Sequence, residues 1–161
     1  MNPCPCGHLG SRLRHCRCTP DQVARYQGRL SGPLLDRIDL HIEVPAIPPQ
    51  ELLEAPPGES SADVRARVER ARERAMVRQG VPNHALAGAQ IDRHVALDAS
   101  ASTLLHKAAT RFGWSARSTH RALKVARTIA DMADSPAVES GHIAEAMQYR
   151  HSLSAPIAPR D

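Results

Sequence analysis

Apolar side chains recur at helical spacing along most of the chain, and polar residues that favour helix starts divide this pattern into segments. Most of these segments open at a residue whose side-chain oxygen can accept a free backbone N–H of the first turn. The predicted caps are, in chain order, Thr19, Ser60 or Ser61, Asp98 and Ser115, and Ser140 is predicted to open the last helix. The predicted helices are 20–30, 62–79, 88–96, 99–112, 116–133 and a last one from Ser140, with Gly80 and Gly113 as terminators.

One segment alternates instead of following the helical period. Ile38, Leu40, Ile42 and Val44 are separated by single polar residues, which predicts a half-buried β-strand over 38–44. This is the one convincing strand in the sequence, and a single strand has no ladder partner. We therefore expect it to join a sheet that these 161 residues do not supply.

Prolines separate the alternating segment from the helical remainder of the chain. We expect residues 1–45 to belong to one domain, 46–60 to form a Pro-rich linker, 61–150 to form a helical domain and 151–161 to form a disordered tail. The predicted fold class is mostly α, with the helical domain preceded by a Cys-rich loop, one helix and a single strand.

The composition narrows the range of partners. The net charge of +4 is mild and mixed with acids, so it permits a nucleic-acid or nucleotide partner without requiring one. Aromatic residues make up only 2% of the chain, so the platforms on which single-strand binders stack bases are scarce. No apolar run has the length of a membrane span and no signal pattern opens the chain, so we expect no membrane partner and a cytoplasmic protein.

The four cysteines form two close pairs, Cys4-Pro-Cys6 and Cys16-Arg-Cys18. Four thiolates can close a tetrahedral structural zinc site, which would also order a loop that has few apolar residues. Cys-x-Cys is a less specific ligand spacing than Cys-x-x-Cys, and His8 or His15 could replace one thiolate. Unligated structural thiols and a redox pair are the alternatives.

Two arginines occupy positions that suit an anion. Arg37 follows a rigid Ser-Gly-Pro turn directly before the alternating segment, where its guanidinium is placed to point outward. Arg117 lies in the first turn of the helix capped by Ser115, whose free N–H groups also attract anions. The alternative for Arg37 is a surface ion pair with Asp36 or Asp39, and for Arg117 a side chain that meets only solvent.

With these residues in place, the chain resembles the magnesium-chelatase-like AAA+ ATPases of the YifB/ComM type. The resemblance runs through residues 1–150 but corresponds to only the C-terminal third of such a protein. The matching sequence is Met1–Gly7, Cys16-x-Cys18, Arg25-Tyr26, Ser31–Asp39, Val64-Arg65 through Arg78–Gly80, Asn83, Leu86, Ser115–Arg117, Arg121, Leu123–Asp131 and His142–Arg150.

The resemblance implies three residue roles. Asn2 would be the sensor-1 residue that positions the attacking water, and Arg37 the arginine finger that reaches the nucleotide of a neighbouring subunit. Arg117 would be the sensor-2 arginine that touches the nucleotide of its own subunit. Residues 38–44 would be the last strand of a five-stranded αβα AAA+ core, of which this chain holds an incomplete part, and residues 61–150 would be the helical AAA+ lid.

The resemblance also implies ATP and Mg²⁺ as cofactors of the complete protein, an N-terminal core segment as partner, a homo-oligomeric ring expected to be a hexamer, and DNA as a further partner. These 161 residues contain no Gly-Lys-Ser/Thr phosphate-binding loop (Walker A), and the magnesium-binding acidic motif (Walker B) is also missing. We therefore expect the chain to be inactive as an ATPase when alone.

Two other functions fit the sequence. A non-enzymatic nucleic-acid-binding module would combine a zinc-binding cysteine cluster with a helix-turn-helix, formed by helix 99–112, the Gly113-Trp114 turn and the helix from 116. A plain helical interaction domain would bind a partner ATPase instead. Salt-dependent DNA binding by the isolated chain would favour the first of these over the second.

Overall fold

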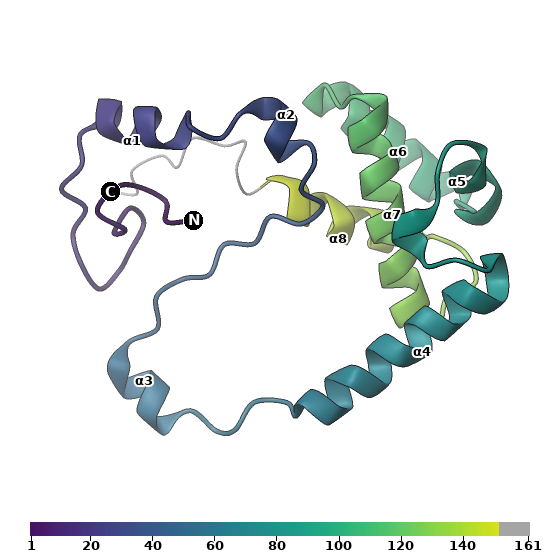
Figure 1. Cartoon of the computed structure of the whole chain (residues 1–161), viewed down its shortest axis with the longest axis horizontal. Coiled ribbons are helices and arrows are strands. Elements are labelled where there is room, and N and C mark those ends of the chain that lie inside the picture. Colours follow the sequence, from purple (N-terminus) through teal and green to yellow (C-terminus); the bar gives the residue numbers. More distant parts are fainter. Residues whose placement is uncertain (152–161) are drawn as a thin grey trace. The chain divides into compact units, whose positions relative to one another are not determined.

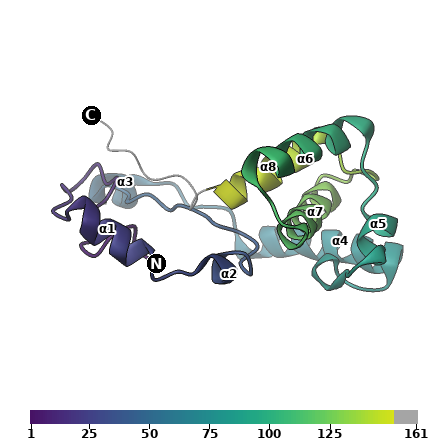
Figure 2. The ribbon, with the colours of Figure 1, turned by 90° about the horizontal axis from the view of Figure 1, so that it is seen from above.

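The computed structural model describes residues 1–151, which form two compact units, Met1–Pro57 and Gly58–His151. Both units are built from helices (Figure 1 and Figure 2), so the predicted mostly helical fold class is confirmed. The predicted disordered tail lies outside the described residues, except for His151, where the last helix ends. Within the described part of the chain, no helix is both long and apolar enough to cross a membrane.

The first unit opens with the Cys-rich loop and contains three short helices. The predicted capping box at the first helix is confirmed, because Thr19 Oγ1 accepts from the N–H of Gln22 and Gln22 Oε1 accepts from the N–H of Thr19. This helix ends three residues earlier than predicted, where Gly28 takes the C-cap position. The helices are α1 (Pro20–Gln27), α2 (Gly32–Leu35) and α3 (Pro49–Glu54), the last of them inside the predicted Pro-rich linker.

The predicted strand over 38–44 does not form in the described chain. Its alternating apolar side chains stay exposed, and Ile42 and Val44 keep 66% and 82% of their surface accessible. The physical reason is the one that the sequence raised: a strand is stabilised by ladder partners, and residues 1–151 contain no other strand to pair with it. Residues 38–44 therefore have the sequence pattern of a β-strand, but the described residues offer them no sheet to join.

The second unit follows the predicted pattern of caps and terminators closely. The side chains of Ser60, Asp98 and Ser115 each accept a backbone N–H at a helix start. Gly80 and Gly113 end two helices in the left-handed region, with φ of 74° and 60°, where glycine is favoured. The elements are α4 (Ser61–Gln79), η1 (Asn83–Ala85), α5 (Ala89–His94), α6 (Ala99–Phe112), α7 (Ala116–Met132) and α8 (Ser140–His151).

Helix α7 lies at the centre of the second unit, where it packs against α4, η1, α5 and α8. The segment before α6 is tied to the segment before α8 by a bridge between Leu97 and Val138. The buried hydrophobic core consists of Leu86, Ile91, Val95, Ala101, Leu105, Leu123, Ala126, Ala130, Val138, Ile143 and Ala146. Aliphatic side chains therefore build this core, in keeping with the low aromatic content.

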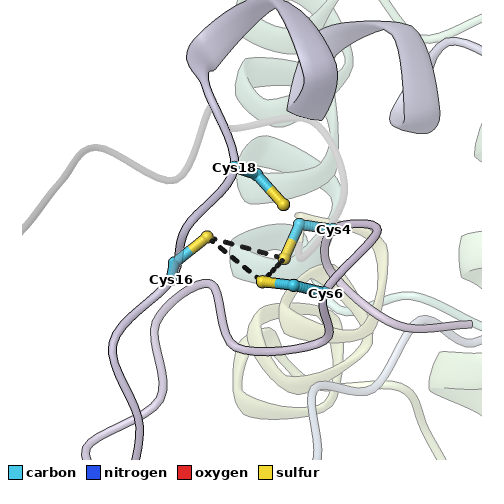
Figure 3. Close-up of side chains that lie close together, drawn as sticks. All are labelled: Cys4, Cys6, Cys16 and Cys18. Atoms are coloured by element: carbon cyan, nitrogen blue, oxygen red, sulfur yellow. Dashed lines mark hydrogen bonds between the residues drawn. The ribbon is translucent and has the colours of Figure 1, made fainter.

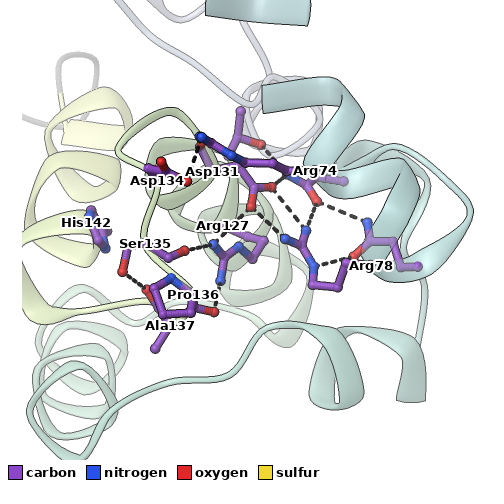
Figure 4. Close-up of polar contacts among 12 residues, drawn as sticks. Arg74, Arg78, Arg127, Asp131, Asp134, Ser135, Pro136, Ala137 and His142 are labelled. Atoms are coloured by element: carbon purple, nitrogen blue, oxygen red, sulfur yellow. Dashed lines mark hydrogen bonds and ion pairs between the residues drawn. The ribbon is translucent and has the colours of Figure 1, made fainter. Parts of the chain in front are cut away.

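Buried charge is the second feature that holds this unit together (Figure 4). Asp131 of α7 is 1% exposed, and the guanidinium of Arg78 in α4 donates two hydrogen bonds to its carboxylate, of 2.6 and 3.0 Å. Asn83 of η1 donates to the same carboxylate at 2.7 Å. Arg127, one turn earlier on α7 and also 1% exposed, contacts it at 2.9 Å. One carboxylate thus joins α4, η1 and α7.

The Arg127 guanidinium also stabilises the turn after α7. It donates to the carbonyl oxygens of Ser135 at 2.6 Å and Pro136 at 3.0 Å. Burial by itself would raise the pKa of Asp131, but the hydrogen bonds from Arg78 and Asn83 and the charge of Arg127 outweigh it, so the pKa lies below its usual value. The carboxylate is therefore held in its charged form.

We expect Asp131→Ala to destabilise the second unit severely, because it leaves the buried guanidinium of Arg127 without its counter-charge. The free energy of unfolding should fall by about 3–5 kcal/mol, as measured by chemical denaturation followed by circular dichroism. Glu59→Ala, which removes the exposed partner of Arg67, is the matched control and should cost less than about 1 kcal/mol. Equal losses in the two variants would contradict a special role for the buried carboxylate.

The lowered pKa of Asp131 also predicts how stability depends on pH. A carboxyl group with a depressed folded-state pKa contributes its full stabilisation above its unfolded pKa of about 3.9 and loses it as the pH falls through the folded value. The wild-type chain should therefore lose stability in acid below roughly pH 4, and Asp131→Asn should lose less over the same interval. Thermal unfolding at a series of pH values measures this difference.

Candidate functional site

The four cysteines of the first unit meet in one cluster (Figure 3). The sulfur of Cys4 lies 3.4 Å from that of Cys6 and 3.7 Å from that of Cys16, and the sulfurs of Cys6 and Cys16 are 3.6 Å apart. The sulfur of Cys18 completes the group, in which all four ligand atoms lie within 4.8 Å of one another. The structure thus brings together two pairs of thiols that are separated by nine residues of sequence.

The backbone around the cluster explains how two short Cys-x-Cys pairs can converge. After the first pair, the N–H of Gly7 donates to the carbonyl of Cys4, and both Gly7 and Gly10 adopt positive φ, of 81° and 75°. These turns bring the chain back toward itself, in conformations that glycine adopts without strain. After the second pair, the Thr19 cap begins α1 at once, so the helix start fixes the exit of the loop.

The thiols of the cluster differ in acidity. Backbone hydrogen bonds from Arg17 and His8 lower the pKa of Cys6 to about 6, so this sulfur is the one that ionises most readily. A backbone hydrogen bond from Cys6 would lower the pKa of Cys18, but burial and the neighbouring thiols outweigh it and raise the value to about 12. The pKa of Cys16 is also raised, for the same balance of reasons. The thiols of the cluster therefore lose their protons one after another as the pH rises, and not together.

The donor set fits a metal ion that prefers sulfur. A zinc–sulfur distance of about 2.3 Å implies a tetrahedron whose sulfurs are about 3.8 Å apart, close to the distances among Cys4, Cys6 and Cys16. Thiolates are soft ligands that suit zinc or iron and not the hard cations magnesium and calcium. A cation would also cancel the mutual repulsion that opposes ionisation of all four thiols. The cluster is thus a candidate metal centre.

The first unit also carries the two predicted catalytic residues, both with exposed side chains. Asn2 lies beside Gly7, where a Cβ would stand 3.5 Å from its Nδ2. Arg37 follows α2, whose cap Ser31 accepts the N–H of Leu34, and the N–H of Arg37 donates to the carbonyl of Leu34 at 3.0 Å. Within residues 1–151, Arg37 has no ion pair, so the surface-pair alternative is not observed.

The predicted nucleotide-binding residue belongs to the second unit. Arg117 lies in the first turn of α7 with an exposed side chain, two residues after the cap Ser115, whose hydroxyl accepts the N–H of Ser118 at 3.2 Å. The positive end of the helix dipole and a guanidinium therefore face solvent at the same place. An anion is the ligand that both would stabilise.

The helix-turn-helix alternative fits the second unit poorly. A recognition helix must present one free face to the major groove. Helix α7 is instead surrounded, and between Ser118 and Asp131 its only exposed residue is Thr128. The α6–turn–α7 segment exists as predicted, but its second helix packs against α4, η1, α5 and α8, which leaves little of its surface exposed.

Sequence reasoning did not find the buried ionic cluster of Arg78, Asn83, Arg127 and Asp131. The available signal was the position of Arg127 and Asp131, because they share the face of α7 that also carries the buried Leu123 and Ala130. Charged residues one turn apart on an apolar face indicate a buried pair and not a solvated surface.

Comparison with known families agrees with the division into two units. Residues 58–150 match the family described as magnesium chelatase, subunit ChlI C-terminal. Residues 1–52 match the family described as magnesium chelatase, subunit ChlI. The two matches together cover nearly all of the described residues.

Individual relatives match over the same range. The uncharacterized protein YifB of Escherichia coli K12 is 45% identical over 151 residues, which are 93% of this chain and 29% of YifB. The competence protein ComM of Haemophilus influenzae is 44% identical, with the same coverage. The uncharacterized protein Rv2897c of Mycobacterium tuberculosis is 35% identical over 94% of this chain and 30% of its own length. The chain therefore spans less than a third of the curated relatives that it matches.

Proposed function

Because the chain belongs to the magnesium chelatase ChlI family, we propose that it acts as the C-terminal part of a ring-forming AAA+ ATPase that remodels DNA. In this proposal residues 1–45 complete an αβα core, residues 46–60 form a linker and residues 61–150 form the helical lid. The N-terminal remainder of the core supplies its other strands, and the assembled ring is a homo-oligomer, taken to be a hexamer.

The observation that carries this proposal lies at the end of α2. Arg37 is exposed and has no ion pair within residues 1–151, and the next seven residues present apolar side chains to solvent at alternate positions. A sheet that adds its neighbouring strands to residues 38–44 would bury those side chains. It would leave Arg37 at the start of an edge strand, where a guanidinium can reach a neighbouring subunit.

Three residues take roles in the proposed reaction. The chemistry that ATP and Mg²⁺ supply to the complete protein is phosphoryl transfer to water. Asn2 orients the attacking water through its side-chain amide, and Arg37 directs its fork of donors at charge that develops on the phosphoryl group in the adjacent subunit. Arg117 and the N-terminus of α7 bind phosphate oxygens from the lid of the same subunit.

We further propose that the cysteine cluster holds a zinc ion as a structural centre. Cys4, Cys6, Cys16 and Cys18 would bind it as thiolates, and the closed donor set leaves no position for substrate. The support for this role is that Cys4 is the one buried hydrophobic residue of the first unit, so a hydrophobic core cannot order the loop.

Arg37→Ala should abolish ATP hydrolysis in an assembled enzyme. We would join the segment of Escherichia coli YifB that precedes its matched region to residue 1 of this chain and measure steady-state ATP turnover. Loss of an arginine finger should reduce turnover by about 10³–10⁵-fold. Arg37→Lys should also be poor, because lysine keeps the charge but lacks the rigid fork of donors.

Arg65→Ala is the matched control for this experiment, because Arg65 is an exposed arginine of α4 that has no proposed role. An active chimera whose turnover is unchanged by Arg37→Ala would contradict the finger assignment. A chimera that assembles but shows no turnover would contradict the proposed activity itself. The 161-residue chain without the added segment should not hydrolyse ATP.

The zinc proposal predicts a single bound zinc ion per chain, measured by atomic absorption after purification without chelators. Cys16→Ser should lower the zinc content strongly, because a hydroxyl is a poor zinc ligand beside thiolates. His15→Ala is the neighbouring control and should retain the metal if the ligands are the four cysteines. Loss of zinc from His15→Ala, or a metal-free wild-type protein, would contradict the four-thiolate site.

A further inference from the structure

The positive charge of this protein is concentrated at one end of the sequence. Residues 1–30 contain five arginines and a single acidic residue, Asp21, which gives this stretch a net charge of +4. The whole chain also has a net charge of +4, so the remaining residues are neutral overall. A local excess of positive charge of this kind favours an anionic partner, and the net charge of the whole chain does not reveal it.

Three of these arginines belong to the loop that the cysteine cluster closes. Arg12 and Arg14 lie between the two cysteine pairs, and Arg17 lies within the second pair. All three side chains are exposed, and none has an ion pair with any other part of residues 1–151. Within residues 1–151, their charges are therefore not neutralised by a carboxylate.

The same loop surrounds a hollow of about 560 Å³, lined by Cys6, His8, Arg14, His15 and Arg17. Among the described residues, no acidic side chain lines it, and a guanidinium is a permanent positive charge with a planar fork of donors. The other arginine-lined hollow, against α4, differs in this respect. It includes Glu73, and its Arg74 and Arg78 are bound to Asp134 and Asp131.

The loop also presents its arginines in a defined geometry. Its two ends meet at the cysteine cluster, and Gly7 and Gly10 form its turns. At the outer part, the hydroxyl of Ser11 accepts the N–H groups of Leu13 and Arg14, at 3.1 and 3.4 Å. A loop that is already ordered loses little conformational entropy when a ligand binds, which favours binding by few contacts.

We infer that residues 7–17 bind the phosphate backbone of a nucleic acid. Arginines spread along a loop suit successive phosphates of a strand, whereas a free nucleotide presents its phosphates at one point. No Phe, Tyr or Trp precedes Tyr26, so the loop lacks the large aromatic platforms on which bases usually stack, and we expect the contact to be independent of base sequence. This assigns a surface to the DNA part of the proposed function and rests on that part, but not on the roles of Arg37 or Arg117.

The test compares two variants of the 161-residue chain that lose the same charge. Arg12→Gln/Arg14→Gln/Arg17→Gln removes the loop arginines, and Arg65→Gln/Arg70→Gln/Arg72→Gln removes three exposed arginines of α4. Binding to fluorescein-labelled single-stranded and double-stranded DNA of mixed sequence is followed by anisotropy over a KCl series, without ATP. The loop variant should bind at least tenfold more weakly, and its salt dependence should fall by up to about three units of slope. The α4 variant should bind as the wild type does.

Additional measurements distinguish a nucleic acid from a free nucleotide or an acidic protein as the ligand, and they control for folding. Arg12→Lys/Arg14→Lys/Arg17→Lys keeps the charges and should retain most of the affinity, with the helical circular dichroism of the wild type. A fluorescent ATP analogue should bind the loop variant and the wild type alike, and polyglutamate should compete with DNA only weakly.

Four results would overturn the inference. The first is an equal loss of DNA affinity in the loop and α4 variants, and the second is absence of DNA binding by the wild type at low salt. The third is a loop variant that no longer binds the ATP analogue but still binds DNA. The fourth is a Lys variant that folds but no longer binds DNA. Strong competition by polyglutamate would identify an acidic protein as the partner instead. Because no ATP is present in the DNA titrations, their outcome is independent of whether the chimeric enzyme turns over ATP.

Discussion

The carboxylate of Asp131 holds residues 58–151 in one arrangement, because three segments direct hydrogen-bond donors at it. Arg78 reaches it from α4, Asn83 from η1, and Arg127 from the preceding turn of α7. Buried charges are stable only when they are paired and hydrogen-bonded, so these segments cannot shift independently. A helix rises about 1.5 Å per residue, so the cluster anchors α7 at a point roughly 20 Å from Arg117, in the first turn of the same helix.

The first unit, Met1–Pro57, depends on different forces. Its order comes from the caps at Thr19 and Ser31 and from the four-sulfur cluster, and Cys4 is its one buried hydrophobic residue. Such local devices fix short-range geometry but bury little apolar surface, which is the main source of stability in folding. This contrast explains why the sequence pattern of 38–44 predicts a strand that the chain does not form: a ladder is a contact between segments, and residues 1–151 contain no strand to make it with.

Features that depend on only a few neighbouring residues, such as helix caps, could be predicted from the sequence. Thr19 and Asp98 cap helices as predicted, because an N-cap depends only on the three residues that follow it. The convergence of the cysteines followed from their paired spacing and from the glycines that let the loop return. The burial of Arg127 and Asp131 was missed, because only their place on the apolar side of α7 distinguishes them from the charged residues of a solvated helix face. A whole-chain charge likewise conceals an excess that is confined to residues 1–30.

The proposed contacts of the first unit with nucleic acid and with nucleotide are joined by one short helix. The cysteine loop ends at Cys18, and the next residue caps α1. At the other end of α1, Gln27 Nε2 donates to the carbonyl of Pro3 at 3.0 Å, directly beside Asn2, and the chain then continues through the Ser31 turn to Arg37. Hydrogen bonds and rigid secondary-structure elements are among the features that carry energetic coupling between sites. A displacement of the loop by a bound strand would therefore act on α1 and, through its C-terminal end, on both residues assigned to the phosphoryl group. In the proposed motor this gives DNA binding a direct mechanical route to the step that hydrolyses ATP.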